Sequence, residues 1–397
     1  MQLNTERAMR VMDENGLDGL LATTPANVYY LSGLWSIGMV LSPREPGSYA
    51  LVSRASLSQP VIVVFTGDVD TAVECGPAAR IINYGTFAKY VAEGVELTPL
   101  ETRLKELAID REPRADALEA VAAALEEADL ADKVIGLDET LFDPAYSVEL
   151  TKRYPQLELR PAASVFKQIR MVKTEEEIGR LRAAVQVTEK AILEVVGMAR
   201  EGITGAEMTR EFEKTLIDQG ARPLFTGLGF GRLSAIGQCP PEDVPLKKGE
   251  RIWFDVGCRY QGYSSDVGRT FGFGDPDERT RRYYQATLEG QKRGLEVATA
   301  GATAAEVFHA TVAAVRSAGI PDFRRRHVGH GMGIWPYDPP LLAPGDETVL
   351  EEGMVMAIEP PYYEIGTGGL LVEDTFVVTK GHPELLTSLS RELEIIG

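Results

Sequence analysis

The chain has 397 residues, which is more than one hydrophobic core usually organises, so two or three domains are expected. Hydrophobic residues at 44% and charged residues at 25% are ordinary for a globular protein and exclude a disordered or fibrous chain. The formal net charge of -18 disfavours a nucleic-acid partner, because binding to a phosphate backbone depends on clustered Lys and Arg.

The first residues, MQLNTERAMRVMDENG, form a polar helical pattern rather than a basic stretch followed by an apolar run, so they are not predicted to be a signal peptide. No window of the sequence approaches the roughly 18 apolar residues of a membrane-spanning helix. The three cysteines are too few for a disulfide framework. By default we expect a cytoplasmic protein with no membrane partner.

Residues 1–165 are predicted to form an α/β domain, because apolar runs typical of buried strands alternate with helical patterns. The expected strands are residues 18–22, 49–52, 61–65 and 133–137. Residues 115–128 have the Ala, Leu and Glu content of a helix, and Asp143-Pro144 opens another with Pro in its first turn. We find no motif that carries chemistry in this half.

Residues 166–397 are predicted to form an α+β domain, in which helices back a curved sheet. Thr174 and Glu177 form a capping box that starts a long helix, whose apolar residues recur at three and four positions. Those residues are Ile178, Leu181, Val185, Thr188, Ile192 and Val195. Further helices are expected at residues 277–300 and 303–318, and strands at residues 251–256, 265–271, 354–358 and 370–378. The glycines of residues 226–232 resemble a dinucleotide loop only superficially, because no strand is predicted before them and no helix after them.

Two of these strands carry aspartates. Asp255 lies in RIWFDVG and Asp266 in GYSSDVGRTF, a spacing that allows a hairpin to bring both carboxylates together. Buried carboxylates that face each other repel unless a cation lies between them. Taken alone, the two aspartates favour a surface hairpin with solvated carboxylates over a metal site.

Three further residues shift the balance towards a metal site. His330 lies in RRRHVGHGMGIW, which is predicted to be a glycine-rich loop, and Glu359 and Glu373 lie in the apolar runs MVMAIEPP and GGLLVEDTFVV. Four carboxylates and one imidazole favour two divalent ions, Mn²⁺ first and then Co²⁺ or Fe²⁺, with Zn²⁺ as an alternative. His327, three residues before His330, is not predicted to be a ligand.

With these residues the sequence resembles the metallopeptidase family that contains methionine aminopeptidase, aminopeptidase P and prolidase. The order Asp, Asp, His, Glu, Glu agrees, as do the strings FDVG, SDVGRTF, GHGMG, IEPPYY and VEDTFVVT. The resemblance covers about residues 170–397 and implies the pita-bread fold for the C-terminal domain. PANVYYLSGLW, at residues 25–35, resembles the creatinase-like N-terminal domain of prolidases and aminopeptidase P.

The resemblance also implies roles. Asp255 would chelate one metal ion, Asp266 and Glu373 would bridge both, and His330 and Glu359 would complete the second site. The ions would lower the pKa of a bound water towards about 7, and Glu359 would pass its proton to the leaving nitrogen.

A homodimer is implied as well, in which the N-terminal domain of one subunit lines the active-site rim of the other. Trp35 and Tyr30 are candidates for that rim, and ordinary core packing is the alternative for both.

The chain departs from the family pattern at three positions. Tyr337 stands where prolidases usually carry a histidine seven residues after the metal-binding one, and Gln238 replaces a histidine that usually precedes the first aspartate. Leu371 replaces a frequent arginine. Tyr337 retains a hydrogen-bond donor for a developing oxyanion, and Asp338 could attract a substrate ammonium. We therefore name Glu359, Tyr337 and Asp338 as catalytic candidates, and Gln238, His327 and Trp35 as substrate-binding candidates.

The leading hypothesis is a dipeptidase that hydrolyses the imide bond before a C-terminal proline. One alternative is aminopeptidase P, and another is a pita-bread hydrolase or lyase acting on a small amide-like or sulfonium metabolite. A third alternative is a catalytically silent binding module, against which the retention of all five candidate ligands argues.

Overall fold

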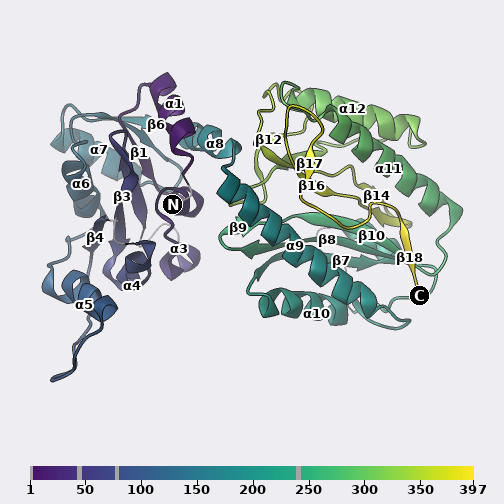
Figure 1. Cartoon of the computed structure of the whole chain (residues 1–397), viewed down its shortest axis with the longest axis horizontal. Helices are drawn as coiled ribbons and strands as arrows, with labels where there is room; N and C mark the ends of the chain where they lie inside the picture. The colour runs from purple at the N-terminus through teal and green to yellow at the C-terminus, as the bar shows by residue number, and fades with distance from the viewer. Residues whose placement is uncertain (1–2, 43–46, 77–79, 238–242) are drawn as a thin grey trace. The chain divides into compact units, whose positions relative to one another are not determined.

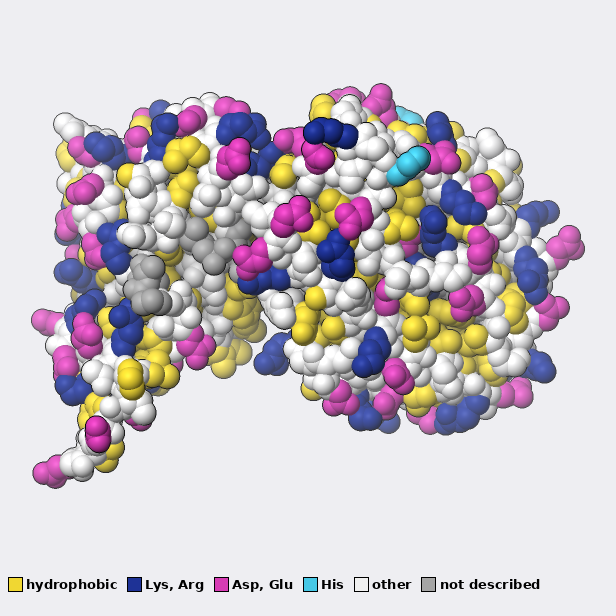
Figure 2. Space-filling model, viewed as in Figure 1, with side chains coloured by type: hydrophobic (Ala, Val, Ile, Leu, Met, Phe, Trp, Pro, Cys, Tyr) yellow, Lys and Arg dark blue, Asp and Glu magenta, His cyan; other side chains and the backbone are white. Residues whose placement is uncertain are grey.

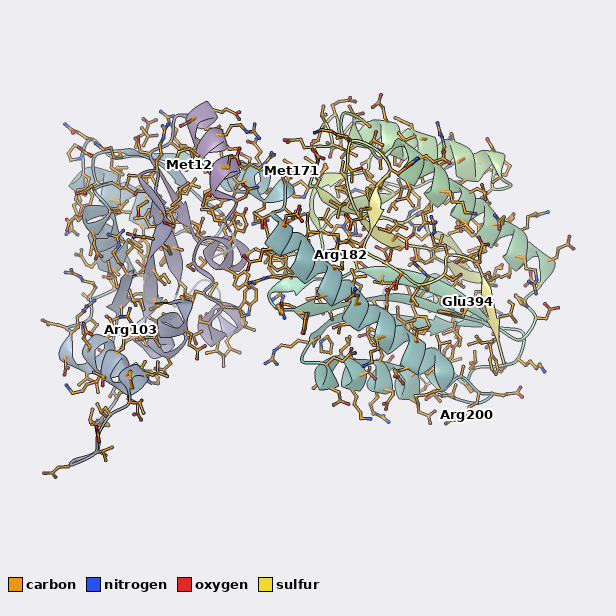
Figure 3. All side chains as sticks on the ribbon, viewed as in Figure 1. Met12, Arg103, Met171, Arg182, Arg200 and Glu394 are labelled. Carbon is orange, nitrogen blue, oxygen red and sulfur yellow. The ribbon has the colours of Figure 1, made fainter. Side chains whose placement is uncertain are left out.

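The computed structural model describes residues 3–42, 47–76, 80–237 and 243–397. The chain divides into two compact units, Met1–Arg170 and Met171–Gly397, which are described separately (Figure 1). The division falls within helix α8 (Ala163–Met171), at the Met171 that is labelled in Figure 3, whereas the sequence placed the domain boundary between residues 165 and 166.

The N-terminal unit is built on a mixed sheet, whose six described strands run in the order β4-β3-β2-β1-β5-β6. They are β1 (Gly19–Ala22), β2 (Tyr49–Ser53), β3 (Ser56–Phe65), β4 (Arg80–Tyr84), β5 (Val134–Leu137) and β6 (Glu158–Pro161). β1 pairs antiparallel with β2 and parallel with β5. All four strands predicted from the sequence are present.

Helices flank this sheet. They are α1 (Thr5–Asn15), α2 (Pro25–Ser32), α3 (Ile37–Leu41), α4 (Val69–Ala72), α5 (Pro99–Lys105), α6 (Ala117–Glu127), α7 (Pro144–Arg153) and α8. Alanines cover the buried face of α6, which lets this helix approach the sheet closely, and Val121 and Leu125 share a core with Val61 and Val63 of β3. The α/β class predicted for this half is confirmed.

The C-terminal unit contains two main sheets. The first runs in the order β18-β10-β8-β7, with the short β9 paired to β8. Its strands are β7 (Arg222–Phe230), β8 (Arg251–Tyr260), β9 (Tyr263–Ser264), β10 (Val267–Phe273) and β18 (Glu394–Ile396). The second runs in the order β12-β11-β13-β16-β17. Its strands are β11 (Gly329–Gly331), β12 (Asp338–Leu341), β13 (Val355–Ile358), β16 (Asp374–Val377) and β17 (Glu384–Leu385), and β14 (Tyr362–Glu364) and β15 (Gly368–Leu370) form a separate ribbon.

Two helix pairs cover these sheets (Figure 1). α9 (Glu175–Gly197) and α10 (Gly205–Asp218) pack against β8 and β7, and α11 (Glu278–Val297) and α12 (Ala304–Ser317) share a core with β13 and β16. The predicted capping box is present, because the amide of Glu177 donates to the hydroxyl of Thr174 and the amide of Thr174 donates to the Glu177 carboxylate. The predicted apolar stripe of α9 is buried. The α+β class is confirmed.

Three local predictions were wrong. No strand was expected before residues 226–232 and no helix after them, but β7 begins at Arg222, pairs with β8 and includes most of these residues, and a 3-10 helix (Gly231–Ile236) follows. His330 was expected in a loop but lies in β11, because its backbone pairs with Ala357 of β13. The strand expected over residues 370–378 is interrupted between β15 and β16, where the backbone turns to bond with β10.

Within the described ranges, no helix is both long and apolar enough to cross a membrane. On the face shown in Figure 2, acidic and basic side chains are interspersed over each unit rather than gathered by sign. Many of them form exposed ion pairs, such as Arg182 with Glu384. Pairs of this kind contribute little to stability, about 0–1 kcal/mol each.

Candidate metal centre

The predicted hairpin brings Asp255 and Asp266 to one side of the first sheet. β8 and β10 are antiparallel, with Asp255 opposite Gly268 and Val256 opposite Val267. Asp266 lies two positions before Gly268, and side chains two positions apart on an extended chain point to the same face. Both carboxylates therefore lie on one face, as the sequence predicted.

The second sheet supplies the other three residues. His330 lies in β11 opposite Ala357 of β13. Glu359 directly follows β13, and Glu373 directly precedes β16. Because Ile358 pairs with Asp374 across these antiparallel strands, the two glutamates come together at one end of the pair.

Backbone hydrogen bonds join the two sheets at this place. The amide of Glu373 donates to the carbonyl of Gly268 over 3.0 Å, and the amide of Leu371 donates to the hydroxyl of Thr270 over 2.9 Å. Position 268 favours glycine, because a Cβ there would lie 2.3 Å from Cδ2 of Leu371 and 2.9 Å from Oε2 of Glu373, and both side chains would have to move. This close approach of the backbone at Glu373 to Gly268 of β10 places Glu373 near the two aspartates.

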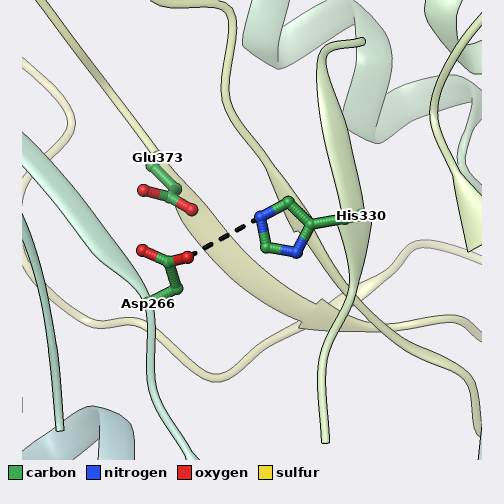
Figure 4. A group of neighbouring side chains, drawn as sticks. All are labelled: Asp266, His330 and Glu373. Atoms are coloured by element: carbon green, nitrogen blue, oxygen red, sulfur yellow. Dashed lines mark ion pairs between the residues drawn. The ribbon is translucent and has the colours of Figure 1, made fainter. Parts of the chain in front are cut away.

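Asp266, His330 and Glu373 point toward one another (Figure 4), and their ligand atoms all lie within 4.8 Å of one another. Nε2 of His330 lies 3.6 Å from Oδ2 of Asp266 and also 3.6 Å from Oε1 of Glu359. These distances are too long for hydrogen bonds and leave room for an ion between the groups.

Several buried polar atoms of this cluster have no hydrogen-bond partner among the described residues. They are Oδ1 of Asp266, both carboxylate oxygens of Glu373 and Nε2 of His330. A buried polar atom without a partner costs free energy, and bound divalent cations would supply partners for atoms of this kind. Oxygen ligands with a single imidazole suit hard or borderline divalent ions, so the donor set fits a metal.

The electrostatics agree with that fit. Burial raises the pKa of Asp255 to about 6 and that of Glu359 to about 8. Burial, together with the neighbouring carboxylates, raises the pKa of Asp266 and of Glu373 well above the ordinary range. Burial lowers the pKa of His330 to about 4, which leaves the imidazole neutral and able to act as a ligand near pH 7. Four crowded carboxylates would favour a bound cation strongly.

A cavity of about 300 Å³ opens onto the cluster. Its lining includes the carboxylates of Asp255, Asp266 and Glu359, and it also includes Tyr337. The ring of Tyr337 stacks on the imidazole of His330 with centroids 3.7 Å apart, and its hydroxyl donates a 3.3 Å hydrogen bond to Oε1 of Glu359. The cavity walls thus combine carboxylates with the hydroxyl groups of Tyr337 and Thr226.

The other predicted site residues have different places. Nδ1 of His327 lies 3.7 Å from Oε1 of Glu359, so this residue adjoins the cluster. Asp338 is only 4% exposed and does not line the cavity. A Cβ on Gly333 would lie 2.7 Å from Oδ2 of Asp338 and 3.7 Å from Cε of Lys173, so the Asp338 carboxylate and the buried Lys173 both lie beside Gly333.

The remaining predicted residues are Gln238, Trp35 and Tyr30. Gln238 lies outside the described residues. Trp35 is half-buried in the N-terminal unit, where it packs edge-on against Tyr29 with ring centroids 5.9 Å apart. Tyr30 is fully buried in the same unit, as its core-packing alternative expects.

Two residues near the cluster, Arg325 and Tyr363, were not predicted from the sequence. The guanidinium of Arg325 lies over the ring of Tyr363, 5.7 Å from its centre. The charge of Arg325 lowers the pKa of Asp255 and of Glu359 against the effect of burial. Arg325 is one of three consecutive arginines, a pattern that is typical of a solvated surface. Only its half-buried position in the structure distinguishes it from Arg324 and Arg326.

Comparisons with known proteins agree with this geometry. The family model of metallopeptidase family M24 matches residues 179–380, and that of the creatinase/prolidase N-terminal domain matches residues 5–172. The Xaa-Pro dipeptidase of Pyrococcus furiosus is 29% identical over 99% of this chain and 100% of its own length, and that of Pyrococcus horikoshii is 28% identical over 99% of each.

Solved structures share the whole two-domain fold. The prolidase from Pyrococcus horikoshii OT3 matches with a TM-score of 0.75 and 27% identity, covering 98% of this chain and 99% of that one. The Xaa-Pro dipeptidase from Bacillus anthracis, at 24% identity, matches with a TM-score of 0.78 over 99% of both chains and supports the fold alone. The predicted combination of a creatinase-like and a pita-bread domain is confirmed, and the chain belongs to metallopeptidase family M24.

Proposed function

We propose that the protein is an Xaa-Pro dipeptidase that requires two divalent metal ions. The observation that carries this proposal is the buried cluster of four carboxylates and one neutral imidazole on the wall of a small cavity, in which several polar atoms lack hydrogen-bond partners among the described residues. The full-length similarity to Xaa-Pro dipeptidases supports the choice of substrate. A cavity of about 300 Å³ suits a ligand as small as a dipeptide.

In this proposal Asp255 would hold the first ion, His330 and Glu359 would hold the second, and Asp266 and Glu373 would contribute to both sites. Mn²⁺ is the preferred ion because oxygen ligands dominate the set, with Co²⁺, Fe²⁺ and Zn²⁺ as alternatives. When bound, the pair of ions would polarise the scissile carbonyl and lower the pKa of a water molecule towards neutrality.

The protein's own groups then handle the proton and the developing charge. Glu359 accepts a proton at a carboxylate oxygen from the water that attacks the scissile carbonyl carbon, and it returns this proton to the proline nitrogen as the bond between that carbon and the nitrogen breaks. Tyr337 donates its hydroxyl hydrogen bond to the carbonyl oxygen as that oxygen becomes negative. Because a tyrosine hydroxyl has one hydrogen, Tyr337 must exchange its hydrogen bond to the Glu359 carboxylate for one to the carbonyl oxygen as the charge develops.

The remaining assignments are predictions. His327, which lies beside Glu359, is proposed to hydrogen-bond the substrate, and Gln238 and Trp35 are proposed to line its binding site. Asp338 is proposed to act on the substrate ammonium, although its burial beside Lys173 favours a supporting role. Domains at residues 1–165 and 166–397, a homodimer and a cytoplasmic location also stay predictions.

A substrate panel tests the proposal. Metal-stripped protein would be assayed with and without Mn²⁺, Co²⁺ or Zn²⁺ on Ala-Pro, Leu-Pro, Met-Pro, Gly-Pro and the tripeptide Ala-Pro-Ala. Metal-dependent cleavage of the dipeptides alone is the expected result. Cleavage of the tripeptide would indicate aminopeptidase P instead. If protein that binds two ions cleaves no peptide, the peptidase proposal is wrong and small non-peptide substrates become the alternative.

A further inference from the structure

The catalytic candidate Tyr337 reaches the carboxylate cluster from a loop. It is the last residue of the loop of residues 332–337, which joins β11 to β12, and its side chain is more than half exposed. The ring stacks on His330, and the hydroxyl donates a 3.3 Å hydrogen bond to Glu359. A hydrogen bond of this length is weak, so the placement of the hydroxyl depends on how the backbone of the loop is held.

The residue that follows Tyr337 is a buried acid. Asp338 opens β12 opposite Gly331 of β11. Asp338 and Lys173 are only 4% and 5% exposed, and both lie beside Gly333 of the loop. A Cβ at Gly333 would lie 2.7 Å from Oδ2 of Asp338, so a side chain there would displace the carboxylate. Two opposite charges are thus buried next to the loop that carries Tyr337.

Lys173 is anchored at both its backbone and its side chain. Its amide donates to the carbonyl of Gly353, just before β13, and its ammonium donates to the carbonyl of Met171 over 3.0 Å. Burial raises the pKa of Glu177, and the charge of Lys173 opposes that rise, so a second buried carboxylate lies near the lysine. That carboxylate already accepts a 2.9 Å hydrogen bond from Tyr263. Lys173 therefore brings a fixed positive charge to a region of buried acids.

The energetics of buried charges give this arrangement a meaning. A buried charge costs free energy unless an opposite charge compensates it, so Asp338 and Lys173 are expected to depend on each other. A buried pair of this kind adds little net stability compared with apolar packing, and its advantage is that it favours one conformation. Because Tyr337 is bonded directly to Asp338, a conformation that is fixed at Asp338 also fixes the start of the tyrosine side chain.

We propose that Asp338 and Lys173 are positioning residues, which hold the loop of residues 332–337 so that the hydroxyl of Tyr337 reaches Glu359. This inference rests on the proposed dipeptidase function, in which Tyr337 donates to the developing charge. Direct contact of Asp338 with the substrate ammonium is the competing assignment. The two differ because a positioning role acts through the hydroxyl of Tyr337, whereas contact with the substrate does not.

A double-mutant cycle in metal-loaded protein separates the two assignments. KM and kcat for Ala-Pro are measured for wild type, Asp338→Asn, Tyr337→Phe and the variant that carries both changes. Lys173→Met disturbs the same pair from its other member. Asp275→Asn, at an exposed ion pair, removes a carboxylate charge by the same substitution and is the matched control. Metal content is measured beside the kinetics.

We expect Asp338→Asn to lower kcat about five-fold or more and to change KM little, because the donor to the developing charge is misplaced. In the Tyr337→Phe background the same substitution should cost little further, since the hydroxyl that it positions is already gone. Lys173→Met should behave like Asp338→Asn, and Asp275→Asn like wild type. Independent losses that multiply in the double variant, or a raised KM as the main effect of Asp338→Asn, would overturn the inference.

Amide hydrogen exchange of the metal-free protein measures the loop without activity. The amides of Met332 and Gly333 donate to the carbonyls of Val355 and Trp335, so their exchange reports on the opening of the loop. Asp338→Asn should speed this exchange, and Asp275→Asn should not. Unchanged exchange in Asp338→Asn would overturn the inference.

The exchange measurement also separates this inference from the proposed function. If wild-type protein cleaves no peptide, the dipeptidase proposal is wrong, yet faster exchange of the loop in Asp338→Asn and in Lys173→Met would still support the pair. Thermal unfolding shows whether each variant is folded. If Asp338→Asn does not fold, the variant with both Asp338→Asn and Lys173→Met takes its place in both measurements, because neither charge is then left buried alone.

Discussion

The hydroxyl of Tyr337 donates a hydrogen bond of 3.3 Å to Oε1 of Glu359. The ring of Tyr337 also stacks on His330, so one side chain contacts two of the proposed ligands. Burial and the nearby carboxylates raise the pKa of the Tyr337 hydroxyl above its ordinary value. The hydroxyl therefore stays protonated and available as a donor throughout the neutral range.

Replacing Tyr337 by Phe removes this donor and keeps the ring. We expect kcat for Ala-Pro to fall about ten-fold or more, because a donor aimed at developing charge contributes a few kcal/mol in a dry site. Steady-state kinetics measure the effect, and metal content measured beside them controls for loss of ions. Unchanged kinetics would remove Tyr337 from the mechanism.

Replacing Glu373 by Gln should have opposite effects on the metal-loaded and metal-free proteins. The loaded variant should lose metal affinity and activity, because both unpartnered oxygens of Glu373 face the proposed site. The metal-free variant should melt at a higher temperature than metal-free wild type, since one of four crowded carboxylates is gone. Calorimetric metal titration and thermal unfolding measure both effects. Glu352→Gln, at an exposed ion pair with Lys380, is the control and should change neither.

The stability of the metal-free protein should depend on pH in a defined window. The pKa of Glu359 is raised from 4.5 to about 8, so above pH 4.5 the unfolded chain releases a proton that the folded chain keeps until about pH 8. The free energy of unfolding therefore falls as pH rises. The lowered pKa of His330 acts in the opposite direction, but only below its ordinary value of 6.5.

The clearest fall is thus expected between pH 6.5 and about 8. Urea unfolding of metal-free protein across this window measures it, and saturating Mn²⁺ should reduce the slope because the ions then stabilise the charged carboxylates. A free energy of unfolding that stays constant or rises over the window without metal would contradict the account.

A buried ion pair between Arg269 and Asp374 adjoins Glu373 of the carboxylate cluster. Arg269 and Asp374 are each 1% exposed, their charged groups lie 2.6 Å apart, and Arg269 also donates to the backbone carbonyl of Glu373. Asp374→Asn should lower the free energy of unfolding by about 3–5 kcal/mol, because it leaves the arginine charge buried without its partner.

Chemical denaturation of the metal-free protein measures this loss. Glu384→Gln breaks the exposed pair with Arg182, the residue labelled in Figure 3, and should cost no more than about 1 kcal/mol. Equal losses in the two variants would show that burial does not give the Arg269 pair its importance.

The features that could be predicted from the sequence are those that depend on residues close together in the chain. Asp255, Asp266, Glu359 and Glu373 stand out because acidic residues interrupt apolar strands, and the capping box of Thr174 is set by neighbours in the chain. The structure brings Asp266, His330, Glu359 and Glu373 together as the resemblance implied. Their roles as ligands stay predictions.

Features that depend on distant partners were not predicted. β7 and β11 were not predicted because both are rich in glycine, which has low strand propensity. These segments are extended because they pair with β8 and β13. The burial of Asp338 follows from packing near Lys173, which lies far away in the sequence. The half-buried position of Arg325 likewise arises only when its loop folds over Tyr363.

The central claim is that two metal ions held by the carboxylate cluster make this chain a dipeptidase. Its most direct test titrates metal-stripped protein with Mn²⁺ while bound metal and hydrolysis of Ala-Pro are measured together. The account predicts no hydrolysis without metal and activity that saturates when two ions are bound per chain. Hydrolysis by stripped protein in the presence of a chelator, or two bound ions without hydrolysis of any Xaa-Pro dipeptide, would contradict it.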